Sequence, residues 1–209
     1  MTYRNSKAFL ILLLGMLSAF GPFVIDLYLP ALPALAQFFD TSASMAQMTL
    51  TTGMLGLAFG QLIFGPLSDK YGRKMPLLVS LLVYLVSTVL IVFAPSIEAL
   101  IALRLVQGLA SAGSVVISRA VVADLYEGQE MTRFFGALMT VNGLAPILSP
   151  ILGSVLLKFT DWRGMFVFLA LIGVAMILTT TRFYESLPVQ KRMKESVASS
   201  FAALFKVWG

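Results

Sequence analysis

The chain has 209 residues, of which 58% are hydrophobic and only 12% charged, and its mean hydropathy is +0.90. Soluble domains carry about 25% charged residues, so this composition excludes one and indicates an integral membrane protein. The net charge of +5 does not indicate a nucleic-acid partner, because no basic face alternates with aromatic residues. The chain has no cysteine or histidine, which excludes thiol chemistry and the commonest metal ligand.

Six long apolar segments can each cross the ~30 Å hydrocarbon core as a helix, which takes about 20 residues. They cover residues 8–30, 46–67, 76–95, 98–118, 134–157 and 163–182. The sequence therefore predicts an all-α polytopic membrane protein with six transmembrane helices in residues 1–182. Residues 183–209 are predicted to be a cytoplasmic linker, and we interpret the final apolar stretch FAALFKVWG as the start of a missing second half.

Cations are distributed unequally between the two sides of this arrangement. Only Lys158 and Arg163 lie on one side. Twelve lie on the other: Arg4, Lys7, Lys70, Arg73, Lys74, Arg119, Arg133, Arg182, Lys191, Arg192, Lys194 and Lys206. Because Lys and Arg are enriched in cytoplasmic loops, we expect a multi-pass protein of the cell membrane (the inner one where there are two) with a cytoplasmic N-terminus. A cleaved signal peptide is not expected, since the first apolar run is too long and five spans follow it.

The turn between the second and third spans has the sequence GPLSDKYGRK, residues 65–74. Glycines there permit close helix packing and a tight reversal, and the aspartate can meet the positive N-terminus of a neighbouring helix. The stretch resembles the signature loop between helices two and three of the major facilitator superfamily. The loop residues to which this resemblance assigns a conformational role are Gly65, Asp69, Gly72, Arg73 and Lys74. An ordinary basic anchor turn is the alternative.

Other segments resemble motifs of the same family. IALRLVQGLASAG (101–113) is similar to its fourth-helix motif, and DWRGMF (161–166) to the element that opens its sixth helix. IDLYLPALP (25–33), together with QMTLTTGMLGLAFGQLIFGPLSD (47–69), resembles the Bcr/CflA group of drug efflux pumps.

The fifth span contains APILSPILGS (145–154), which resembles the fifth-helix motif of the antiporter branch. Pro150 and Gly153 match that motif, whereas Ala145, Ser149 and Ser154 stand where the family usually has glycine. The spacing of small residues is retained, so the stretch predicts a close helix contact. The substitutions reduce its value as a sign of antiport.

The resemblance implies a transporter with two six-helix halves, each a pair of inverted three-helix repeats, of which this chain matches the N-terminal one. It implies a proton-coupled multidrug antiporter that exports small amphipathic antibiotics or other toxic compounds. No cofactor or metal is expected, since a proton gradient would drive it. The expected partners are the lipid bilayer, a drug-like molecule, protons, and the missing C-terminal half or a second copy.

Two other functions stay open within this reading. One is an uptake symporter or facilitator of the same superfamily, and the other is a truncated membrane protein that does not transport. An enzyme is not expected, because no nucleophile, metal-ligand set or acid–base pair stands on a loop.

Asp26 in the first span and Arg104 in the fourth are ionisable residues inside predicted spans. A charge there costs at least ~2.5 kcal/mol, so each needs a reason. Both fall at comparable depth in the outer part of the bilayer, and the resemblance implies neighbouring helices that line the central cavity. We hypothesise that Asp26 is the proton-responsive carboxylate and that Arg104 controls its charge, because desolvation favours the neutral acid and a guanidinium the carboxylate. The alternatives are an interfacial aspartate beside Pro30 and an Arg104 that reaches the outer headgroups.

A second charged cluster is predicted at the cytoplasmic ends of the helices. We hypothesise that Arg73 pairs with Asp124, with Arg119 and Glu127 nearby, and so latches the inner ends of helices two and four during alternating access. Asp69 differs, since the resemblance implies that its partner is a helix N-terminus in the second half. The alternative is an exposed set of weak ion pairs worth ~0–1 kcal/mol each.

Uncharged polar residues inside the spans are expected to hydrogen-bond between helices, as such residues do in membrane bundles. They are Gln61, Gln107 and Asn142. The eleven Met and sixteen Phe residues offer an adaptable apolar wall, and none of them is assigned to a substrate.

Overall fold

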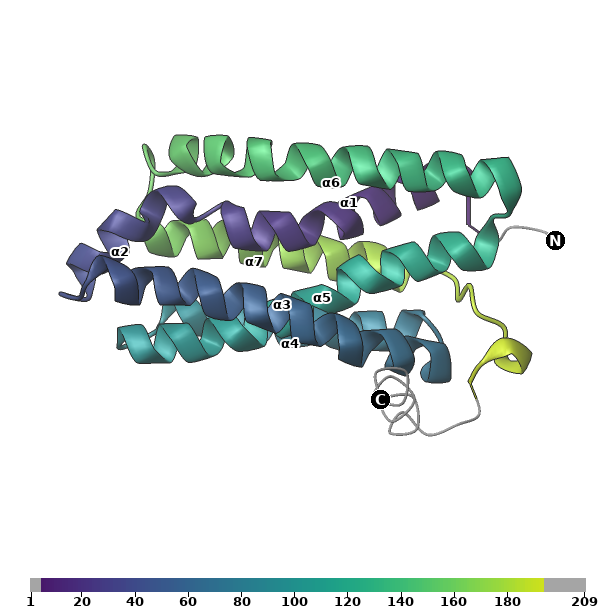
Figure 1. Ribbon diagram of the computed structural model, residues 1–209, viewed down its shortest axis with the longest axis horizontal. Coiled ribbons are helices and arrows are strands. Elements are labelled where there is room, and N and C mark those ends of the chain that lie inside the picture. The colour runs from purple at the N-terminus through teal and green to yellow at the C-terminus, as the bar shows by residue number, and fades with distance from the viewer. Residues whose placement is uncertain (1–4, 194–209) are drawn as a thin grey trace, which may run out of the picture.

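The computed structural model describes residues 5–193, and no strand occurs within that range (Figure 1). Its elements are α1 (Lys7–Asp26), the 3-10 helix η1 (Leu29–Ala31), α2 (Leu32–Phe38), α3 (Ala43–Tyr71), α4 (Lys74–Val92), α5 (Ile97–Leu125), α6 (Gly128–Leu156), α7 (Trp162–Thr181) and the 3-10 helix η2 (Val189–Lys191). The predicted second-half start FAALFKVWG lies outside the described residues.

Within residues 5–193, six spans are long and apolar enough to cross a membrane, which confirms the predicted all-α bundle. The first span combines α1, η1 and α2, and each of the others is one helix. Several helices run beyond the predicted apolar segments. The fourth span continues to Leu125 rather than ending at 118, and the fifth begins at Gly128 rather than 134. Hydropathy detects only the part of a helix that lies in hydrocarbon, whereas backbone hydrogen bonding continues into the polar ends.

Four of the long helices begin at a side chain that satisfies a free backbone N–H group. Ser6, Ser42, Ser96 and Asp161 accept hydrogen bonds of 3.1–3.3 Å from the N–H three residues further on. Such N-caps compete with helix continuation and so set where a helix starts. The α4 and α6 N-termini have no side-chain cap of this kind.

The first span is broken near its middle. α1 ends at Asp26, and the chain resumes in η1 and α2, which carry Pro30 and Pro33 at their second positions. Proline lacks an N–H and is tolerated in the first turn of a helix, so this sequence favours ending one helix and starting another. Asp26 is thereby placed at the carbonyl end of α1.

α5 is the central helix of the bundle and packs against α1, α3 and α4, while α7 covers α4 and α6 covers α1. Its approach to α3 depends on glycine. A Cβ at Gly108 would lie well under 3.0 Å from the carbonyl oxygen of Gly53, and one at Gly56 would do the same to Leu105. The two backbones therefore touch, as small residues allow in membrane helix pairs.

The start of α1, the loop between α3 and α4, and the segment after α7 lie at the same end of the bundle, on the right in Figure 1. There Asn5 exchanges two hydrogen bonds with the backbone of Tyr184, both 3.2 Å long, and Lys7 forms an ion pair with Glu130. We call this the signature-loop end. α2 lies at the opposite end.

Candidate functional site

Arg104 is fully buried inside the bundle. Its Nη1 donates to the carbonyl oxygen of Val24 at 3.1 Å and to Oε1 of Gln107, and its Nε donates to the carbonyl oxygen of Thr49 at 3.4 Å. The guanidinium carbon lies 4.3 Å from the centre of the Tyr28 ring, a cation–π distance. Arg104 therefore does not reach outer headgroups, and the snorkelling alternative is wrong.

A chain of hydrogen bonds fixes the orientation of this guanidinium. Gln107 accepts from Arg104 and donates through Nε2 to Oγ1 of Thr88 at 2.7 Å, and Thr88 donates to the carbonyl oxygen of Tyr84 at 2.6 Å. All of these side chains are buried. Gly53 leaves room for the group, since a Cβ there would lie 2.9 Å from Nη2. Among the described residues, Nη2 has no hydrogen-bond partner.

Asp26 is half-buried, and no ion pair joins it to Arg104 in residues 5–193. The connection between them runs through the first span instead. Arg104 binds the carbonyl of Val24, two residues before Asp26, and stacks on Tyr28, two residues after it. The guanidinium thus lies at the negative, carbonyl end of α1, where a cation is favourable. The structure does not place Arg104 on a cavity wall shared with Asp26, because the whole side chain is enclosed by packed helices.

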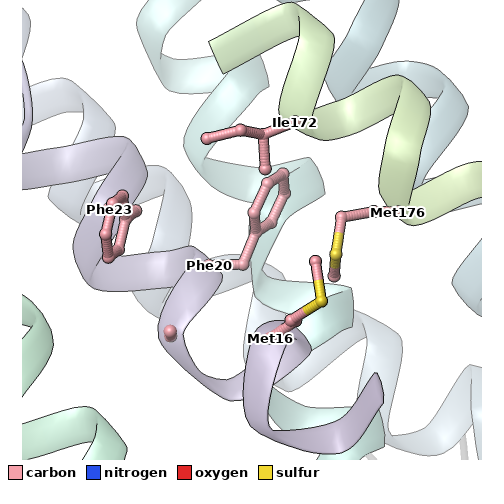
Figure 2. Close-up of a pocket in the computed structure, with 6 residues that line it drawn as sticks. Met16, Phe20, Phe23, Ile172 and Met176 are labelled. Atoms are coloured by element: carbon pink, nitrogen blue, oxygen red, sulfur yellow. The ribbon is translucent and has the colours of Figure 1, made fainter. Parts of the chain in front are cut away.

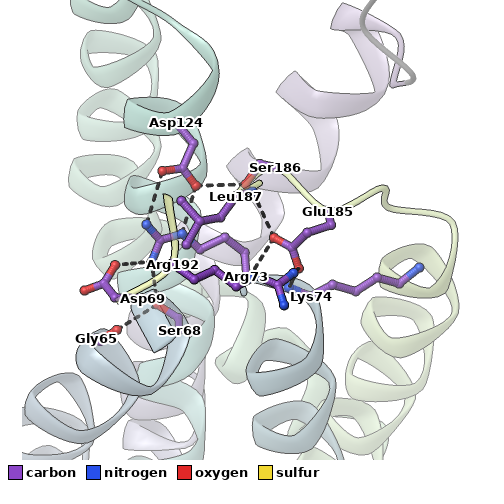
Figure 3. A network of polar contacts seen from close by, with 10 residues as sticks. All are labelled: Gly65, Ser68, Asp69, Arg73, Lys74, Asp124, Glu185, Ser186, Leu187 and Arg192. Atoms are coloured by element: carbon purple, nitrogen blue, oxygen red, sulfur yellow. Dashed lines mark hydrogen bonds and ion pairs between the residues drawn. The ribbon is translucent and has the colours of Figure 1, made fainter. Parts of the chain in front are cut away.

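At the signature-loop end, Arg73 is bound by two carboxylates (Figure 3). Its Nε and Nη2 donate to the two oxygens of Asp124 at 2.8 and 3.1 Å, and its Nη1 donates to Asp69 at 2.5 Å and to Ser68 at 2.8 Å. The Arg73 and Asp124 side chains are only 7% and 12% exposed, so this pair is not one of the exposed, weak ion pairs that were the alternative to a latch. Burial disfavours the charge on Arg73, but its hydrogen bonds to Asp124 and Asp69 outweigh that and raise the pKa of Arg73.

The other loop residues have different roles in the structure. Gly72 has φ +92°, a conformation that favours glycine, and it ends α3. Within residues 5–193, Gly65 is not required for close packing, because a Cβ there would meet only Val116, at 3.9 Å. Lys74 donates to the carbonyl oxygen of Thr181 at 2.7 Å, at the end of α7. The expectation that Arg119 and Glu127 join the cluster is not met among the described residues, where neither forms an ion pair.

Sequence reasoning missed the contribution of residues 183–193, which we call the tail segment. This part of the predicted linker packs onto the loop: Glu185 accepts hydrogen bonds from the backbone N–H groups of Arg73 and Lys74, and Ser186 donates to Asp124 (Figure 3). The only sequence signal was a glutamate directly after a span, which does not by itself indicate a partner.

The antiporter-like motif forms a buried stripe on α6. Ala145, Ser149 and Gly153 are buried, and Ser149 donates to the carbonyl oxygen of Ala145 at 2.6 Å. A Cβ at Gly153 would clash with the carbonyl oxygen of Leu27, so the first span and α6 touch closely there. Pro150 is half-buried within the helix. Gly153 therefore makes the kind of close helix contact that the spacing of small residues indicated.

Gln107 and Asn142 also link helices: Asn142 donates to Ser18 of α1. Among the described residues, Gln61 bonds only within its own helix, to the carbonyl oxygen of Leu57.

An apolar pocket of about 200 Å³ lies between α1 and α7 (Figure 2). Its lining consists of Met16, Ala19, Phe20, Phe23, Ile172 and Met176. These side chains offer shape and dispersion contacts but no charge, and no candidate charged residue lines this pocket.

A family model described as Major Facilitator Superfamily matches residues 9–209. The chain belongs to the major facilitator superfamily. An uncharacterized MFS-type transporter, YdgK of Bacillus subtilis (strain 168), is 40% identical over 191 residues, which cover 90% of this chain and 48% of that protein. A bicyclomycin resistance protein homolog of Haemophilus influenzae is 36% identical over 174 residues, 83% of this chain and 44% of that protein.

The crystal structure of the human organic anion transporter MFSD10 (TETRAN) has the same fold. Its TM-score is 0.73 at 22% identity, over 93% of this chain and 51% of that one. The similarity to a bicyclomycin resistance protein homolog agrees with the predicted Bcr/CflA group. The chain spans about half the length of the curated relatives it matches.

Proposed function

We propose that the chain forms the N-terminal half of a proton-coupled efflux transporter that exports small amphipathic antibiotics or similar toxic compounds through the cell membrane. The signature-loop end would face the cytoplasm, as the cation distribution indicates. The other half of the transporter, or a second copy of this chain, would supply the second wall of the transport pathway. The similarity to a bicyclomycin resistance protein homolog supports the substrate class.

The observation that carries the coupling proposal is the position of Asp26. It is a half-buried carboxylate at the break of the first span, and Arg104 binds the chain on both sides of it. Protonation of Asp26 would change the charge at the carbonyl end of α1, where Arg104 is held. Arg104 would thus act as a positioning residue for the break, in place of the direct pair that the sequence suggested.

Transport would follow from competition at this break. In a low-dielectric site, a carboxylate is stabilised either by binding a proton or by an ion pair with a cationic group of a substrate. A protonated Asp26 has no charge left for that ion pair, so the two weaken each other's binding. Entry of one would therefore favour release of the other. Alternating access would then require the Arg73–Asp124 contact to break and re-form as the halves move.

The test is drug or dye export in everted membrane vesicles with an imposed pH gradient, with the chain alone and in a full-length protein that supplies the second half. We expect Asp26→Asn to reduce gradient-driven export at least tenfold. Asp40→Asn is the matched control, since Asp40 is exposed and its φ of +46° suits asparagine as well. Undiminished gradient-driven export by Asp26→Asn would exclude the coupling role. Export that ignores the gradient in both variants would favour the facilitator alternative.

A further inference from the structure

The N-terminus of α4 lacks a cap from its own sequence. Its N-cap residue is Arg73, whose side chain makes no capping hydrogen bond and instead points to Asp124 and Asp69. The first N–H groups of a helix need acceptors, and those buried without one are costly. An acceptor from another part of the molecule can therefore stabilise this helix end in place of water.

Glu185 of the tail segment supplies it. Its Oε1 accepts from the N–H of Arg73 at 2.8 Å, and its Oε2 accepts from the N–H of Lys74 at 3.1 Å. Oε1 also accepts from the N–H of Leu187 at 3.0 Å, which folds the tail segment around the carboxylate. Both charge and geometry suit a helix N-terminus, which favours an anion. The acceptor comes from a residue that lies 112 positions away along the chain.

The tail segment also contacts the two aspartates that bind Arg73. Ser186 donates to Oδ2 of Asp124 at 2.9 Å, and this is the same oxygen that accepts from Nε of Arg73. The N–H of Met193 donates to the carbonyl oxygen of Asp69 at 2.9 Å. Arg73, Asp69 and Asp124 are thus each contacted by the tail segment, at the backbone or the side chain.

The fit between the tail segment and Gly72 is close. A Cβ at Gly72 would lie 2.6 Å from Oε2 of Glu185 and 2.7 Å from Nη2 of Arg192. Gly72 thus serves two purposes, the positive φ of the reversal and the space in which the Glu185 carboxylate reaches the α4 N-terminus.

We propose that Glu185 and Ser186 are positioning residues of the signature loop, and that the tail segment and the Arg73–Asp124 contact form and open together. Glu185 holds the backbone of Arg73, and Ser186 holds the carboxylate that Arg73 binds. Displacement of the tail segment exposes the α4 N-terminus and removes one of the two donors to Oδ2 of Asp124. Neither the Arg73 backbone nor the Asp124 carboxylate is then held in place for the contact, which weakens it. The link to transport rests on the proposed function, whereas the coupled opening does not.

The test measures local opening in the chain itself. Hydrogen exchange at the Arg73 and Lys74 amides is compared between the unaltered chain, Glu185→Ala and Glu127→Ala, all monodisperse in detergent. Glu127 is the matched control because it is an exposed glutamate at the same end, and its side chain does not cap its helix. Loss of a cap shifts the opening equilibrium about fivefold, so we expect exchange at both amides to rise about fivefold in Glu185→Ala alone.

A second readout follows the tail segment. The chain has no cysteine, so Leu187→Cys introduces a unique thiol at a buried position. We expect its labelling by a maleimide to accelerate about fivefold when Glu185→Ala, Ser186→Ala or Asp124→Asn is added, and not with Glu127→Ala. Glu185→Gln retains one carbonyl acceptor, so it keeps the fold testable and should give an intermediate rate. Rates equal to those of the control in both assays would overturn the proposal whatever the result for export by Asp26→Asn.

Discussion

Replacement of Arg104 by lysine tests whether the contacts of the guanidinium, rather than its charge alone, hold the break in the first span. Lysine retains a positive charge on one nitrogen, which cannot at once replace the Nη1 contacts, the Nε contact with Thr49 and the position of the guanidinium carbon over the Tyr28 ring. One or two hydrogen bonds between membrane helices contribute about 0.6–1.7 kcal/mol each, and a desolvated cation–π contact about 1–2 kcal/mol. The variant should therefore lose about 2–4 kcal/mol of stability.

For a chain of this size, that loss corresponds to a fall in Tm of roughly 5–15 °C, measured as the temperature at which half of the purified protein stays monodisperse. Arg133→Lys is the control, because Arg133 is exposed on α6. We also expect Arg104→Lys to lose gradient-driven export even at temperatures where it stays folded, since the chain on both sides of Asp26 is no longer held. Equal Tm values for the two variants, or full export by Arg104→Lys, would refute this account of the break.

Two further pairs of substitutions test the packing of α3 on α5 and the ion pairs of Arg73. Gly108→Ala should lower Tm, because its methyl group would meet the backbone of Gly53 and force α3 away from α5, and such overpacking costs about 1–3 kcal/mol. Gly136→Ala is the control: a Cβ there meets open space, so Tm should stay unchanged or rise. Similar Tm values for the two variants would contradict the close contact between α3 and α5. Asp124→Asn should lower Tm more than Asp69→Asn, since the Asp124 side chain is 12% exposed and the Asp69 side chain 50% exposed. Breaking a buried ion pair costs about 3–5 kcal/mol, whereas breaking an exposed one costs about 0–1 kcal/mol. The reverse order of the two Tm values would show that burial does not set the strength of these contacts.

Much of the candidate site could be predicted from the sequence, because an ionisable residue inside an apolar span is conspicuous. Asp26 and Arg104 were identified in this way. The contact between Arg73 and Asp124 was predicted instead from the charges at the cytoplasmic ends of the helices, and it is present in the structure. The direct pairing of Asp26 with Arg104 was not found among the described residues. The sequence could not show that the guanidinium binds backbone carbonyls instead, since every residue has a carbonyl and only the helix break leaves those of α1 available.

Three features follow from the sequence by itself: the six spans, the tight turn at Gly72 and the small-residue stripe of α6. Each depends on a local property, namely hydropathy over a span, a glycine where the chain reverses, and the spacing of small residues. Only the tertiary structure decided which groups meet. The Val24 carbonyl that Arg104 binds is 80 positions away from it along the chain, and the Glu185 carboxylate that caps α4 is 112 positions away from Arg73. Such partners are selected by the geometry of helix packing, which brings together helix ends that have no local signal for each other.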